Sequence, residues 1–160
     1  MVNIAALRCG HSGAIEDLRN ALFNHGYFYA TDVADLPAEY IRGVYEYSGR
    51  VHALPASIKQ KYAQRGGTGS YSGPDIGQPE LQYEASGAVA NVCGWDYSRA
   101  RFSLGSSGEE GDARYPPAST LSPPFANVLD ELYERQNKLA RVLMTGLEAA
   151  LELPERTLLN

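Results

Sequence analysis

The longest regular pattern in this 160-residue chain is an apolar stripe in its last third. Apolar side chains recur every three or four residues from Phe125 to Ala150, which predicts an amphipathic helix of about seven turns. Pro123 and Pro124 lead into it, and Glu152-Leu153-Pro154 ends it, because proline cannot continue a helix. Pro154 is predicted to begin another short helix. A helix of this length needs a partner for its apolar face, and this need limits the possible folds.

The first third of the chain is predicted to alternate strands and helices. Asp35 is the expected N-cap of the second helix, and Gly26 is expected to end the first because glycine readily takes the left-handed conformation. Lys59 and Lys61 are expected on an exposed side of a short helix. The predicted elements are a strand over residues 2–7, a helix from Ser12 to Gly26, a buried strand over 27–31, a helix from Asp35 to His52 and a short helix over 56–63.

The middle of the chain is rich in glycine, serine and proline, which favours loops and short strands. Residues 81–87 are expected to form a turn of helix and residues 91–102 to be partly extended. A connection this long is typical of functional or mobile segments. The resulting organisation is one α+β region with three parts: residues 1–63 (strand, helix, strand, helix), residues 64–122 (Gly/Pro-rich loops) and residues 123–153 (the long helix).

Charge and hydropathy exclude several classes of protein. The chain has fourteen Lys and Arg and nineteen Asp and Glu, which gives a net charge of −5, and no segment concentrates basic residues. Nucleic acids and anionic membranes are therefore poor partners. No apolar run approaches the roughly 20 residues that span a bilayer, and the N-terminus does not resemble a signal peptide. We expect a soluble, cytoplasmic protein in which Cys9 and Cys93 are both reduced thiols.

Familiar nucleotide and metal motifs are absent from the sequence. Residues 67–73 have the spacing G-x-G-x-x-x-G, one residue longer than the dinucleotide fingerprint, and open no predicted helix. A flexible loop over a cleft is the better interpretation. His11, His25 and His52 each lack the second ligand of a His-x-Asp/Glu or H-E-x-x-H motif. We therefore assign no catalytic or metal-binding residue in this chain.

The most distinctive cluster runs from Cys93 to Arg99 and holds the only tryptophan, Trp95, beside Asp96. A tryptophan, an acid, a tyrosine and an arginine this close together are suited to recognising a polar organic ligand. The alternative interpretation, which the sequence favours equally, is that Asp96 and Arg99 form an ion pair that fixes the loop. The eleven tyrosines of the chain also have two interpretations. They line a hydrated cleft, or they take the place of phenylalanine in the core.

Four segments in chain order resemble one enzyme family, the isopenicillin N synthase-like (iron/ascorbate) oxidoreductases. Residues 21–29 (ALFNHGYFY) resemble the family's helix followed by G-F-F-Y. Residues 52–62 (HALPASIKQKY) resemble its F-F-x-L-P-x-x-x-K-x-K-Y segment. Arg65-Gly66 with Tyr71-Ser72-Gly73 resembles its glycine-tyrosine loop, and residues 147–154 resemble the end of its L-L-x-x-L-A-x-x-L-x-L-P helix.

The resemblance implies a non-haem Fe(II), 2-oxoglutarate-dependent dioxygenase, with ascorbate as reductant and a small organic substrate. In that family, His-x-Asp, a distal His and Arg-x-Ser hold the metal and the cosubstrate within a double-stranded β-helix. No such motif occurs here, and the chain ends where that region would begin. We therefore expect the N-terminal half of such an enzyme, inactive alone, whose partner is the β-helix half or a second copy bound through the long helix.

The resemblance also implies a substrate wall. Arg65 and Tyr71 match the loop that edges the substrate pocket in the family, and composition adds Trp95 and Asp96. The alternative function is a free-standing binding or interaction module without catalysis. The long helix distinguishes the two functions. If its apolar stripe packs against a missing β-helix, the isolated chain exposes an apolar face.

Overall fold

Helices make up most of the described chain, with a few strands of two to four residues between them. The computed structural model describes residues 1–63, 71–77, 80–83, 89–92, 94–95 and 119–159. Two compact units divide the chain: unit 1 comprises Met1–Arg42 and Leu132–Asn160, and unit 2 comprises Gly43–Glu131. Within the described residues, no helix is both long and apolar enough to cross a membrane.

Unit 1 begins with strand β1 (Val2–Asn3) and two helices, α1 (Ile4–Arg8) and α2 (Ser12–His25). The apolar run at residues 2–7 therefore forms a strand for only two residues. The Asn3 side chain accepts a hydrogen bond from the Ala6 amide at 2.8 Å, which caps α1 and turns the rest of the run into helix. Helix α2 ends where expected, with Gly26 in the left-handed conformation at φ 77°.

The aromatic segment after α2 differs from its predicted form. Only Ala30–Thr31 is a strand, β2, which pairs in parallel with β1 in the register Val2↔Ala30. Tyr27 is 66% exposed and Tyr29 74% exposed, so the prediction of a buried strand over residues 27–31 is wrong. The two rings lie edge to face, with their centroids 6.4 Å apart.

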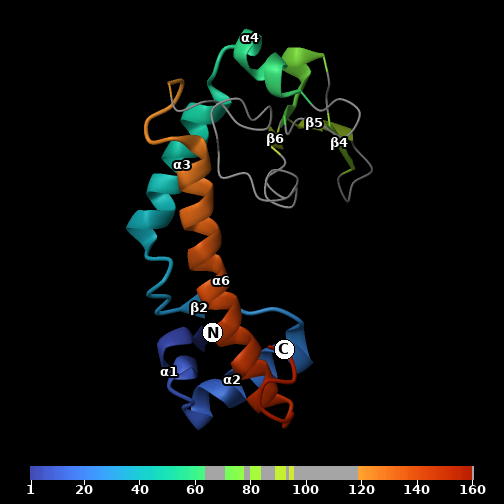
Figure 1. Cartoon of the computed structure of the whole chain (residues 1–160). Coiled ribbons are helices and arrows are strands. Elements are labelled where there is room, and N and C mark those ends of the chain that lie inside the picture. The colour runs from blue at the N-terminus through green and yellow to red at the C-terminus, as the bar shows by residue number, and fades with distance from the viewer. Residues whose placement is uncertain (64–70, 78–79, 84–88, 93, 96–118, 160) are drawn as a thin grey trace. The chain divides into compact units, whose positions relative to one another are not determined.

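The core of unit 1 forms where α1 and α2 meet the C-terminal part of α6 (Phe125–Ala150) (Figure 1). Leu139, Val142, Leu143 and Leu147 of α6 pack against it. Gly146 of α6 lies so close to α1 that a Cβ atom there would stand 2.8 Å from Cδ1 of Leu7. The buried members of this core are Val2, Ile4, Leu7, Ala14, Leu18 and Ala150.

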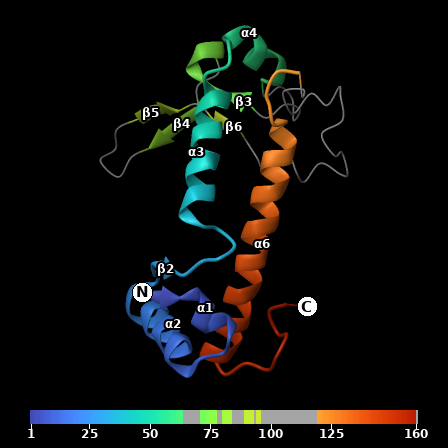
Figure 2. The same ribbon diagram turned by 90° about the vertical axis from the view of Figure 1, so that its left-hand side faces the viewer.

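Unit 2 has a separate core between the second half of helix α3 (Ala38–His52) and the start of α6, which lie side by side in Figure 2. The rings of Tyr47 and Phe125 stack with centroids 6.3 Å apart. The Tyr47 hydroxyl donates to the Pro123 carbonyl at 2.8 Å, and Arg50 donates to the Ser122 carbonyl at 2.7 Å. The buried members are Tyr47, Val51, Tyr62, Tyr71, Leu121 and Phe125.

After α3, unit 2 continues with helix α4 (Ala56–Lys59), the 3-10 helices η1 (Gln60–Tyr62) and η2 (Pro74–Ile76), and four strands. Strand β3 (Tyr71–Ser72) pairs antiparallel with β6 (Gly94–Trp95), and β4 (Glu80–Tyr83) pairs antiparallel with β5 (Val89–Val92). The predicted helical turn over 81–87 is therefore wrong at its start, which is strand. The extended prediction for 91–102 is confirmed where it overlaps β5 and β6.

The long helix is confirmed as α6, and its C-terminal end is closed by backbone hydrogen bonds. The Leu153 amide donates to the Glu148 carbonyl at 2.9 Å and the Glu152 amide to the Ala149 carbonyl at 3.3 Å, the two bonds of a Schellman cap. The short helix expected at Pro154 does not form. Instead, the buried Glu148 carboxylate accepts from the amides of Arg156 (3.0 Å) and Leu158 (2.7 Å), which holds that segment as a turn.

Candidate functional site

Of the four predicted substrate-wall residues, Tyr71 is the one whose side chain the structure describes. It lies in β3, is fully buried, and its backbone pairs with Trp95 of β6. Arg65 and Asp96 lie outside the described residues, and Trp95 is described by its backbone alone. The structure thus brings Tyr71 and Trp95 together as neighbours across two strands.

Lys59 is the unexpected member of this region. It is 7% exposed, whereas the helical pattern predicted an exposed side for it and for Lys61; Lys61 is exposed. The Lys59 ammonium donates to the His52 carbonyl at 2.9 Å, forms an ion pair with Asp75, and lies 5.2 Å from the centroid of the Tyr71 ring. These contacts replace water around the buried charge, which would otherwise make burial costly.

Asp75 connects Lys59 to Tyr71. One carboxylate oxygen pairs with Lys59, and the other accepts the Tyr71 hydroxyl at 2.9 Å. Burial opposes ionisation of this carboxyl group, but the hydrogen bonds from Lys59 and Tyr71 outweigh burial and hold its pKa below the ordinary value. Asp75 therefore stays charged, and the Tyr71 hydroxyl is already engaged within the protein.

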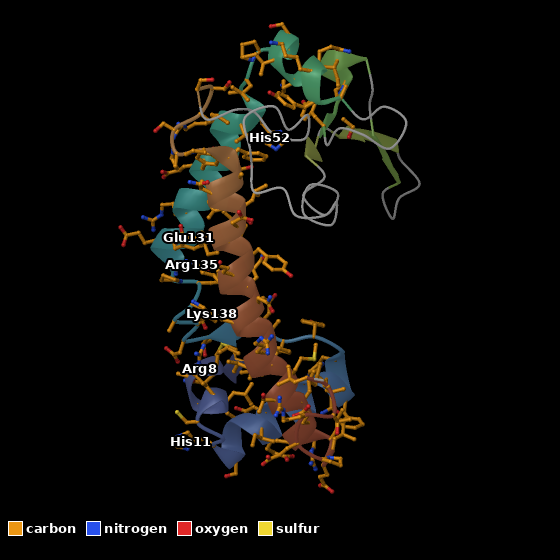
Figure 3. All side chains as sticks on the ribbon, in the orientation of Figure 1. Arg8, His11, His52, Glu131, Arg135 and Lys138 are labelled. Atoms are coloured by element: carbon orange, nitrogen blue, oxygen red, sulfur yellow. The ribbon has the colours of Figure 1, made fainter. Side chains whose placement is uncertain are left out.

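His52 is the last residue of α3, and Figure 3 labels it. Burial lowers the pKa of its imidazole first, and the nearby Lys59 charge lowers it further, against the opposing effect of Asp75. The His52 imidazole is therefore uncharged near neutral pH. His11 precedes the first residue of α2 and belongs to unit 1.

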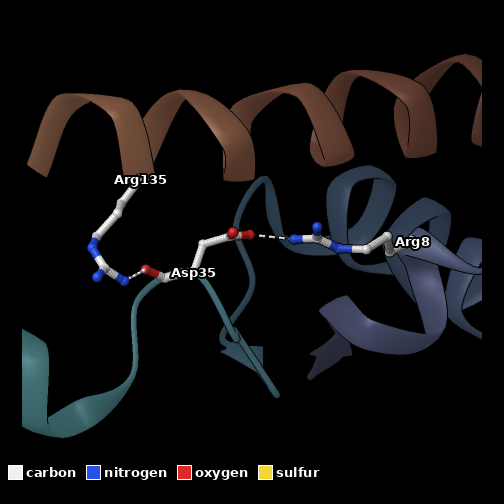
Figure 4. A network of polar contacts seen from close by, with 3 residues as sticks. All are labelled: Arg8, Asp35 and Arg135. Carbon is white, nitrogen blue, oxygen red and sulfur yellow. Dashed lines mark hydrogen bonds and ion pairs between the residues drawn. The ribbon is translucent and has the colours of Figure 1, made fainter. Parts of the chain in front are cut away.

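A second polar network lies in unit 1 (Figure 4). The Asp35 carboxylate forms an ion pair with Arg8, and the Asp35 carbonyl accepts from Arg135 at 3.0 Å. The Arg135 guanidinium also stacks 4.1 Å from the centroid of the Tyr40 ring. Helix α3 begins at Ala38, three residues after Asp35, so the prediction of Asp35 as its N-cap is wrong. The carboxylate binds Arg8 of α1 instead.

Metal ligands do not gather in the part of the chain that the structure describes. No three His, Cys, Asp or Glu side chains there are placed to hold one ion. Cys9 is an exposed free thiol, and Cys93 lies outside the described residues. The described side chains therefore do not fit the Fe(II) site that the oxygenase family requires.

No protein-family model matches the chain, and searches of curated proteins and of solved structures gave no match either. The likeness to the iron/ascorbate oxidoreductases therefore rests on the four sequence segments alone.

The sequence contains one signal for the role of Lys59 and none for that of Asp75. Lys59 is spaced one helical turn from Tyr62 and Ala63, which are both buried, so its position belongs to the apolar face. Asp75 follows sixteen residues later, beyond any helical or hairpin spacing, and only the folded chain shows that it is the partner.

Proposed function

We propose that this chain is the N-terminal part of a non-haem Fe(II), 2-oxoglutarate-dependent oxygenase that oxidises a small organic substrate, with ascorbate as reductant. The observation that supports the proposal is where the family-like segments fall in the fold. Three of the four segments mark the junction of two elements: Gly26 ends α2, Leu54-Pro55 separates α3 from α4, and Leu153-Pro154 follows α6. Glycine and proline at such junctions fix element lengths, so these segments set the order and size of the elements.

Iron and 2-oxoglutarate would be held outside the described side chains, because these do not form a ligand set. When bound in the whole enzyme, the metal would supply the activation of dioxygen. No catalytic step is assigned to a residue of this chain. Its proposed contribution is to support the catalytic half and to supply one wall of the substrate pocket.

The proposed wall is the β3–β6 pair with the segments that adjoin it. Trp95 and Asp96 would contact substrate, together with Arg65, which precedes β3 in the sequence. Tyr71 has its hydroxyl on Asp75 and its ring in the core, so its part in the wall is to support β3 from within. Ala substitution of Trp95 should raise the substrate KM of the whole enzyme and leave turnover of 2-oxoglutarate without substrate unchanged.

The deciding experiment is the intact mass of the native protein, captured from its source cells with an antibody against this chain. The proposal expects a product substantially longer than 160 residues that contains His-x-Asp, a distal His and Arg-x-Ser. That product should release succinate from 2-oxoglutarate in an Fe(II)-dependent way. A native protein of 160 residues without such activity would contradict the proposal.

One observation favours the alternative, a free-standing binding or interaction module. Much of the apolar stripe of α6 packs within this chain, against unit 2 through Val128 and Leu129 and against unit 1 through Leu139 and Leu143. Tyr133 and Met144 remain 39% and 38% exposed. Sedimentation of the purified chain separates the two functions: self-association indicates a face made for a missing half, and a monodisperse monomer with one cooperative melt favours the module.

A further inference from the structure

We infer that Lys59 is a positioning residue: acting through Asp75 and Tyr71, it fixes the β3–β6 strand pair and hence the place of Trp95. The consequence for substrate recognition rests on the proposed function, whereas the positioning itself does not. The inference follows from a continuous series of contacts that begins at the Lys59 ammonium and ends at the Trp95 backbone.

The first link is the buried ammonium group. Lysine is rarely buried unless its charge is paired, and Lys59 is 7% exposed. Its contacts come from three different segments: the His52 carbonyl at the end of α3, the Asp75 carboxylate in η2, and the Tyr71 ring in β3. One side chain thus joins a helix end, a 3-10 helix and a strand.

The second link is the Asp75 carboxylate, which uses both of its oxygens. Because one oxygen pairs with Lys59 and the other accepts the Tyr71 hydroxyl, the position of the tyrosine depends on that of the ion pair. Hydrogen bonds to a charged group are stronger than those between neutral groups. The Tyr71 hydroxyl is therefore held more firmly than a phenol facing a neutral acceptor.

The third link is the pairing of β3 with β6. Each strand has two residues, and Tyr71 lies directly opposite Trp95. A two-stranded ribbon this short is not stable by itself and needs an anchor in the surrounding structure. The fully buried side chain of Tyr71 supplies the anchor, and the Lys59–Asp75 pair fixes its polar end.

Hydrogen exchange followed by mass spectrometry tests the inference on the full chain. The variant Lys59→Met keeps a long apolar stem and removes the charge, and Lys61→Met is the matched control on an exposed lysine two residues away. We expect the peptide containing Gly94 and Trp95 to exchange roughly tenfold faster in Lys59→Met and to be unchanged in Lys61→Met. Peptides from α2, in unit 1, should exchange as in the wild type.

Trp95 supplies a second measurement, because it is the only tryptophan of the chain. Its fluorescence should become more sensitive to acrylamide in Lys59→Met, while the helical circular dichroism signal stays constant. A local change of this kind separates positioning from a general loss of stability, in which all peptides and both signals would change together.

Two milder variants keep the inference testable if Lys59→Met does not fold. Asp75→Asn removes the negative charge, and Tyr71→Phe removes only the hydroxyl that Asp75 accepts. Faster exchange at Gly94 and Trp95 in both variants supports positioning; unchanged exchange in both overturns it. These outcomes do not depend on oxygenase activity, so the inference can fail while the proposed function stands, and the reverse.

Discussion

Gly146 shows how closely two helices approach in unit 1. A Cβ atom added there would lie 2.8 Å from two side-chain carbons of Leu7, a buried residue with little room to move. We expect Gly146→Ala to destabilise the protein by about 1–2 kcal/mol, because overpacking outweighs the better helix propensity of alanine. Urea denaturation followed by circular dichroism measures the change.

The matched control is Gly49, inside α3, where an added Cβ would meet nothing within 4 Å. Gly49→Ala should therefore show the propensity gain alone and raise stability by up to about 1 kcal/mol. Equal effects of the two substitutions would mean that Gly146 does not mark a close helix contact.

Glu152 takes the left-handed conformation at φ 55°, at the cap position where glycine is usual. Glu152→Gly should stabilise the chain by about 1 kcal/mol, since a side chain at positive φ costs energy. The substitution also removes an ion pair with Arg19, but the Glu152 side chain is 80% exposed, so that pair contributes little. Glu152→Ala, which loses the same ion pair and keeps the strain, should show no gain in thermal melting.

His52 makes stability depend on pH. Burial and Lys59 lower the pKa of its imidazole below the ordinary 6.5, so the unfolded chain takes up a proton before the folded chain does. Stability should therefore fall as pH drops below about 6.5 towards the folded-state pKa. Urea midpoints between pH 7 and 5 should fall less in His52→Gln than in the wild type, and the exposed-site variant His11→Gln should follow the wild type.

At the level of elements, the three long helices were predictable, whereas the bounds of most strands were not. Helices α2, α3 and α6 carry their own signals, apolar spacing and terminal glycine or proline, all within one segment. Strand β1 depends on β2, almost thirty residues later, and the Asn3 cap converts the apolar residues after it to helix. A local pattern cannot contain a partner that lies so far along the chain.

The candidate site was likewise predictable from the sequence only in part. Composition marked Trp95 and the family resemblance marked Tyr71, and the two do pair as backbone neighbours. Burial of Lys59 was missed because its charge outweighed its place on the apolar face. The compensating partner, Asp75, is not determined by any spacing and becomes visible only when α4 and η2 meet.

At the scale of the molecule, two hydrophobic cores share no residue, and α3 and α6 each contribute to both units. We expect the units to open separately under native conditions. Leu18→Ala, which removes a fully buried side chain from unit 1, should cost about 2–5 kcal/mol and accelerate hydrogen exchange in α2 more than in α4 and β3.

The reciprocal variant is Val51→Ala in unit 2, whose side chain is also fully buried. It should accelerate exchange in α4 and β3 and leave α2 near its wild-type rate. If either substitution accelerated exchange equally in both units, the two cores would form one cooperative unit.

Burial of Lys59 also limits which amines of the chain can react. The sequence has three lysines, Lys59, Lys61 and Lys138, of which the last two are exposed. An acylating reagent, or an enzyme that acetylates lysine, therefore meets Lys61 and Lys138 in the native protein and reaches Lys59 only when its ion pair opens. The yield of Lys59 acylation over time thus reports how often this core opens.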